Sequence, residues 1–160
     1  MNVLRYRAED ERATDRLAAA LAATAPPRAV VSLRGPLGAG KTRLVRGVAA
    51  AAGVDPLSVV SPTFVLCQSY RGAIDLHHFD AYRLADEDEF LELGADETME
   101  SDGLTFVEWG ERVHRCLPLD RVDIEIQLTD ETCRQFVLSA GGPQARQWLT
   151  RVMSKLTEIK

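Results

Sequence analysis

Residues 35–42 read G-P-L-G-A-G-K-T, a complete G-x-x-x-x-G-K-[ST] motif. Glycines in such a loop bring backbone amides close to phosphate groups, while the lysine and the hydroxyl reach the outer phosphates and a magnesium ion. The chain has 16 arginines but only three lysines, and Lys41 is the only lysine before residue 155. The position therefore calls for an ammonium group in particular. The expected contacts to ATP are Gly38, Ala39, Gly40, Lys41, Thr42 and Arg43.

Two acidic residues lie where apolar stretches end. Glu108 closes L-T-F-V-E, and a phosphate-binding loop normally has an acidic magnesium ligand at the end of a neighbouring strand. We therefore expect Thr42 and Glu108 to hold Mg²⁺. Asp80 follows apolar residues 74–79 and could orient the attacking water or hold a magnesium-bound water, although it could also cap the next turn. Asp80, Lys41 and Glu108 are the predicted catalytic residues.

Several neighbouring side chains are weaker candidates. Period-two alternation predicts His78, Asp80 and Tyr82 on one face, within reach of a γ-phosphate. Ser61 and Thr63 suit a loop that senses this phosphate, or else an ordinary turn before a strand. A metal site built on His77 and His78 is not expected, because no third soft ligand lies at a recognised spacing. Arg43, Arg83 and Arg112 could stabilise transition-state charge, yet nothing in the sequence marks one of them as an arginine finger. Slow intrinsic turnover is therefore predicted.

The elements that must position these residues are those of an α/β fold with one mixed sheet and helices on both faces. Helices are predicted at residues 9–24, 42–52 and 144–156, with a further helix beginning in the acidic stretch 86–92. Strands are predicted at residues 28–34 and 104–108, and as two hairpins. These hairpins are formed by residues 64–70 with 74–79, and by residues 122–128 with 136–139. The phosphate loop then joins a strand to a helix, as the motif requires.

Length, composition and charge restrict the other function classes. A chain of 160 residues with 46% hydrophobic residues fits one domain, residues 1–160, with its own core. The net charge of −5 gives no general basic surface for a nucleic-acid backbone, so contact with nucleic acid is expected only indirectly. Three cysteines without C-x-x-C spacing favour a reducing cytoplasm. No apolar run reaches the roughly 20 residues of a membrane span, and the alanine-rich stretch 17–25 is interpreted as helix rather than a signal peptide.

Two alternatives to an ATPase remain on the residues alone. A small-molecule or nucleotide kinase would need an acceptor pocket and an arginine-rich lid, whereas residues 82–101 are predominantly acidic. A nucleotide-dependent binding module with incidental hydrolysis has the same sequence features. ATP is preferred to GTP, because the sequence lacks the N-K-x-D motif that reads guanine.

Taken together, four motifs in this order resemble the TsaE (YjeE) family of bacterial P-loop ATPases. They are GPLGAGKT, SPTF at 61–64, HFDAYRL at 78–84 and EW at 108–109, and the likeness covers nearly the whole chain. Phe64 stands where some relatives have tyrosine. The resemblance implies slow, magnesium-dependent ATP hydrolysis in the synthesis of threonylcarbamoyladenosine at position 37 of tRNA.

The resemblance also implies partners and site residues. The chain would act with TsaD and TsaB, reach tRNA only through that complex, and be monomeric alone. Residues 38–42 would cradle the phosphates, Thr42 and Glu108 would ligate magnesium, and Asp80 would be required for hydrolysis. Trp109 matches the family beside Glu108, and a loose alignment places Glu11 and Arg134 near the adenine.

Overall fold

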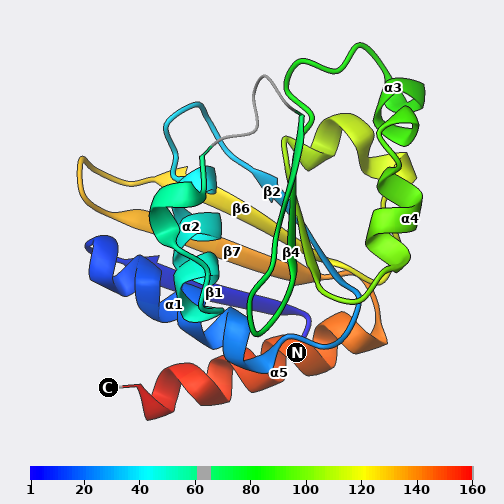
Figure 1. Ribbon diagram of the computed structural model, residues 1–160. Helices are drawn as coiled ribbons and strands as arrows, with labels where there is room; N and C mark the ends of the chain where they lie inside the picture. Colours follow the sequence, from blue (N-terminus) through cyan, green and yellow to red (C-terminus); the bar gives the residue numbers. More distant parts are fainter. Residues whose placement is uncertain (61–65, 160) are drawn as a thin grey trace.

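The computed structural model describes residues 1–60 and 66–159. In this part of the chain seven strands form one mixed sheet in the order β1-β7-β6-β2-β5-β4-β3 (Figure 1). The strands are β1 (Val3–Ala8), β2 (Ala29–Arg34), β3 (Cys67–Tyr70), β4 (Leu76–Asp80), β5 (Leu104–Glu108), β6 (Val122–Leu128) and β7 (Arg134–Ala140).

The middle of the sheet is parallel and its margins are antiparallel. Strand β2 pairs in parallel with β5 and β6, and β5 pairs in parallel with β4. The hairpins β3-β4 and β6-β7, and the pair β1-β7, are antiparallel. The sequence A-V-V-S-L-R suits the central place of β2. Its first five residues are buried, and parallel strands that are covered on both faces are rich in apolar residues such as Val and Leu.

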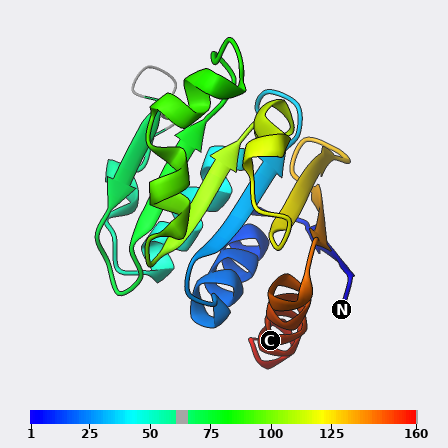
Figure 2. The same cartoon turned by 90° about the vertical axis from the view of Figure 1, so that its right-hand side faces the viewer.

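Helices cover both faces of the sheet, as Figure 2 shows. The first layer contains α1 (Glu11–Thr24), α2 (Lys41–Ala51) and α5 (Pro143–Glu158), together with the 3-10 turn η1 (Pro56–Ser58). The second contains α3 (Glu87–Glu92), α4 (Ala95–Glu100) and the 3-10 segment η2 (Gly110–Cys116). Leu33 and Phe106 belong to the first core, whereas Val30, Phe79 and Val107 belong to the second. Alternate residues of one strand thus serve different cores.

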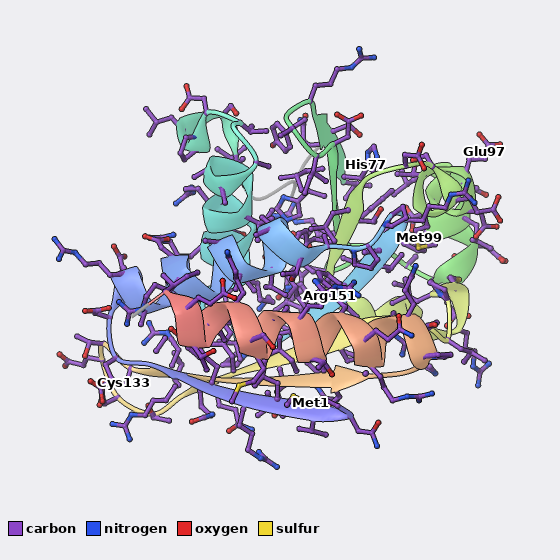
Figure 3. The ribbon with its side chains drawn as sticks, turned by 90° about the horizontal axis from the view of Figure 1, so that it is seen from below. Met1, His77, Glu97, Met99, Cys133 and Arg151 are labelled. Carbon is purple, nitrogen blue, oxygen red and sulfur yellow. The ribbon has the colours of Figure 1, made fainter. Side chains whose placement is uncertain are left out.

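The lower end of the first layer is closed by α5. In Figure 3 this helix, which carries Arg151, runs beside β1 and β7, two neighbouring strands at one margin of the sheet. Trp148 is almost fully buried and its indole nitrogen donates to Thr24 Oγ1 at 3.2 Å. The Arg151 guanidinium donates to the carbonyl of Thr24 at 3.2 Å, so α5 is fastened to the end of α1.

None of the helices among the described residues is both long and apolar enough to cross a membrane.

The fold class predicted from sequence is confirmed, with differences in individual elements. Strand β1 was not predicted, and the first helix begins at Glu11 rather than residue 9, because Asp10 is its N-cap and accepts from Ala13 N at 2.8 Å. The acidic stretch yields two short helices, since Gly94 adopts φ 76° between them. Strand β3 is described only from Cys67, because residues 61–65 lie outside the described part.

Candidate functional site

A cavity of about 510 Å³ lies at the carboxyl ends of β2, β5 and β4, where open α/β sheets usually bind ligands. Strand β2 runs into the glycine-rich loop, β5 ends at Glu108 and β4 ends at Asp80. Asp80 and Glu108 are register partners on neighbouring strands, and Ala81 N donates to the carbonyl of Glu108 at 3.0 Å. The lining residues are Leu37, Gly38, Gly40, Lys41, Thr42, Arg43, Asp80, Tyr82, Arg83, Glu108 and Trp109.

The glycine-rich loop has a backbone that other residues adopt with difficulty. Gly40 has φ 109° directly before α2, a left-handed conformation that glycine adopts without a steric cost. A Cβ on Gly35 would lie 2.8 Å from the carbonyl oxygen of Ile126, so a larger residue would push the loop away from β6. Because the first N–H groups of α2 have no acceptor within the helix, this turn presents donors and a partial positive charge to an anion.

Lys41 is almost completely buried at the start of α2, with 5% of its surface exposed. Its Nζ donates to the carbonyl oxygens of Gly35 at 2.7 Å and Pro36 at 3.1 Å. It also lies 4.1 Å from the centroid of the Trp109 ring, a cation–π contact. Burial lowers the pKa of Lys41 below its ordinary value, while the charges of Glu108, Glu111 and Asp80 oppose that shift. The ammonium is therefore confined to the loop and its charge is little screened by water.

The side chains of Thr42 and Glu108 are in contact in the lining of the cavity. The Thr42 hydroxyl lies 2.9 Å from Oε1 and 3.1 Å from Oε2 of Glu108. A hydroxyl that donates its proton to a carboxylate keeps its lone pairs for a cation, and hydroxyl and carboxylate oxygens are ligands that Mg²⁺ accepts. Glu108 is only 3% exposed, so its charge is concentrated at this position.

Asp80 caps the next turn, one of the roles that the sequence left open, and it also lines the cavity. It is 5% exposed and lines the cavity, while its Oδ1 accepts from Tyr82 N at 2.9 Å and so caps the turn after β4. His78 shares its face of β4, as predicted. Tyr82 lies beyond the strand, yet it reaches the same cavity.

Trp109 forms one wall of the cavity through an unusual backbone conformation. Its φ of 58° is in the left-handed region, which costs a non-glycine residue about 1–3 kcal/mol. Directly after this strained residue the backbone runs close to β2, because a Cβ on Gly110 would collide with the Ser32 hydroxyl. The resulting orientation puts the indole over Lys41 and 4.9 Å from the Tyr82 ring. The sequence placed Trp109 beside Glu108, but it did not predict the contacts of Trp109 with the Tyr82 ring and the Lys41 ammonium.

Three predicted contacts lie outside the lining of the cavity. Ala39 is fully buried in the loop, and its carbonyl accepts from Arg134 Nε at 3.1 Å. Glu11 lies 4.0 Å from Arg43 Nε, at the start of α1. Of the two residues expected near the adenine, Arg134 thus contacts the loop itself and Glu11 contacts the first turn of α2.

The structure also separates the candidate arginines. Arg43 lines the cavity but pairs with Asp15 at 2.7 Å, and Arg83 lines it as well. Arg112 instead donates to the carbonyl of Leu84 at 3.2 Å, which holds η2 against the turn after β4. Ser61 and Thr63 lie outside the described residues, so the predicted phosphate-sensing loop stays a prediction.

A known protein family matches the part of the chain that carries this site. The family model of TsaE, described as a threonylcarbamoyl adenosine biosynthesis protein, matches residues 8–136 of this chain. The chain belongs to the TsaE family. The matched range contains the glycine-rich loop, both site acids and all strands of the sheet except most of β1 and the end of β7.

Individual TsaE proteins are similar over most of their length. The tRNA threonylcarbamoyladenosine biosynthesis protein TsaE of Bacillus subtilis is 36% identical over 143 residues, which cover 89% of each chain. TsaE of Treponema pallidum is 39% identical over 110 residues, covering 69% of this chain and 81% of its own. The crystal structure of YdiB from Bacillus subtilis superposes with a TM-score of 0.80 at 29% identity, over 95% of both chains.

Proposed function

We propose that the chain binds ATP with Mg²⁺ at the cavity beside residues 35–42 and hydrolyses it slowly. The observation that carries this proposal is the convergence of Lys41, Thr42, Asp80 and Glu108 on one cavity from a loop and two strand ends. Amides of the loop and the first turn of α2 would bind the phosphates, and Lys41 would add a positive charge beside them. The register between β4 and β5 fixes Asp80 and Glu108, and Lys41 and Thr42 begin α2.

Each remaining residue has a task set by its position. Thr42 and Glu108 would hold Mg²⁺, which would neutralise charge on the phosphate oxygens. Asp80 would orient the attacking water and accept its proton, because its carboxylate is held at the rim by Tyr82 N. Trp109 and Tyr82 would exclude bulk water from the ammonium side. Water rather than a second substrate is proposed as acceptor, since the acidic segment after Tyr82 suits a phosphorylated acceptor poorly.

Calorimetry with ATP and Mg²⁺ tests the binding site directly. Lys41→Ala should lower ATP affinity about 10–100-fold, the expected loss of a charge-assisted contact of roughly 1.5–3 kcal/mol. Lys155→Ala is the matched control, because Lys155 is a half-buried lysine on α5 outside the lining of the cavity and pairs with Glu158 at 3.1 Å. Equal affinity in both variants would contradict the assignment of the loop.

We further propose that ATP turnover serves threonylcarbamoyladenosine formation at position 37 of tRNA, through a complex with TsaD and TsaB. Family membership supports this role, and the net charge of −5 supports indirect contact with tRNA. In a reconstituted reaction with TsaD, TsaB and tRNA, the wild-type chain should sustain repeated modification, whereas Lys41→Ala should not. Equal modification with the wild type, with the variant and without the chain would refute the role.

A further inference from the structure

His78 is a fully buried polar residue, and neither the family comparisons nor the proposed mechanism gives it a role. It lies on β4 two residues before Asp80, and its Nε2 is 2.8 Å from Glu108 Oε2. Because Asp80 is the register partner of Glu108, His78 reaches that carboxylate diagonally along the shared face of β4 and β5. Both side chains are buried, at 0% and 4% exposure, so water competes little for this contact.

The surroundings of the ring assign its proton. Nδ1 of His78 is buried and has no hydrogen-bond partner among the residues that the structure describes. A proton on Nδ1 would be a buried donor without an acceptor, which costs about 1–3 kcal/mol. A proton on Nε2 instead meets a carboxylate, which only accepts when ionised. The ring is therefore assigned the orientation in which Nε2 carries a proton and donates it to Glu108.

Glu108 is consequently held from two directions. The Thr42 hydroxyl contacts both of its oxygens, and the His78 ring fixes Oε2 from the side of β4. A carboxylate with only one of these donors could turn about its last side-chain bond. We propose that His78 is a positioning residue that orients the Glu108 carboxylate toward the Mg²⁺ held beside Thr42. This inference rests on the proposed function, since it concerns the same metal.

Two amide substitutions separate the hydrogen bond from the space that the ring fills. In His78→Gln the amide nitrogen is as many bonds from Cα as the Nε2 of histidine, so it can donate to Glu108. In His78→Asn the amide is one bond shorter and cannot reach that oxygen. The measurement is the ratio of ATP affinities in Mg²⁺ and in EDTA, obtained by calorimetry, which reports metal coupling without turnover.

His78→Asn should reduce this ratio at least about tenfold, the usual effect of losing the partner of a metal ligand, and His78→Gln should stay within about threefold of wild type. Phe79→Leu is the control, because it removes a buried ring from the same strand on the opposite face. It should leave the ratio unchanged even where it lowers the melting temperature.

The outcomes distinguish this inference from the proposed function. A wild-type chain whose ATP affinity ignores Mg²⁺ would overturn the proposed magnesium site and the inference together. A wild-type response that persists in His78→Asn would overturn the inference alone, and so would an equal loss in Phe79→Leu. A loss in His78→Gln as large as in His78→Asn would do the same, because the donor would then have no effect.

Discussion

The contact between Thr42 and Glu108 should contribute a measurable energy to the folded protein even without nucleotide. Replacing Thr42 by valine keeps the shape and removes the hydroxyl that lies 2.9 Å from Glu108 Oε1. A hydrogen bond to a charged group is worth about 1.5–3 kcal/mol and one to a neutral group about 0.5–1.5 kcal/mol. The cost of Thr42→Val should therefore be about 1 kcal/mol larger when residue 108 is glutamate than when it is glutamine.

A double-mutant cycle measures this coupling without interference from other effects. Urea unfolding at neutral pH would be compared for the wild type, Thr42→Val, Glu108→Gln and the double variant. Glu108→Gln alone could raise stability, because it removes a charge that is 3% exposed, and the cycle cancels that contribution. A coupling energy below about 0.3 kcal/mol, within the error of additivity, would refute the proposed hold of Thr42 on Glu108.

Three further outcomes are expected. Because burial lowers the pKa of Lys41, ATP affinity measured by calorimetry should decline as the pH rises through this lowered pKa, below the ordinary 10.5, whereas the weaker affinity of Lys41→Ala should show no such decline. Asp80→Asn should lower single-turnover hydrolysis about 10²–10⁴-fold while ATP affinity changes little, because asparagine keeps the acceptor for the next turn. Gly47→Ala should destabilise the chain by roughly 1–3 kcal/mol in urea, because its Cβ would lie 2.8 Å from that of Ala18; in an Ala18→Gly background the same change should be neutral or stabilising.

The sequence predicted the elements whose signals are local. Strand β2 was visible as a β-branched apolar run, and α2 as helical spacing that follows the glycine-rich loop. Strand β1 was missed although its six residues alternate between inward and outward positions. It is an edge strand whose pairing with β7 joins the two ends of the chain, and no local pattern shows such a pairing. The break between α3 and α4 depends on the single left-handed Gly94 inside one acidic stretch.

The site was predictable in its members but less so in their contacts. The loop motif and the ends of two apolar stretches named Thr42, Asp80 and Glu108, and the parallel pairing of β2, β5 and β4 brings the two strand ends to one edge of the sheet. The bond from His78 to Glu108 depends on the register between β4 and β5, which no local pattern encodes. The contact of Trp109 with Lys41 depends on a left-handed residue where alternation would continue the strand.

The place of β5 in the strand order determines how firmly Glu108 is anchored. Hydrogen-bonded ladders join β5 to β2 on one side and to β4 on the other, so displacing its end requires two ladders to open together. Within residues 1–60 and 66–159, the outer strands β1 and β3 each pair with one neighbour. Native-state opening should thus begin at the margins, and amides of residues 104–108 should exchange with deuterium far more slowly than those of β1 or β3. Such a pattern would put the slowest exchange at the edge of the sheet where Glu108 is proposed to hold Mg²⁺.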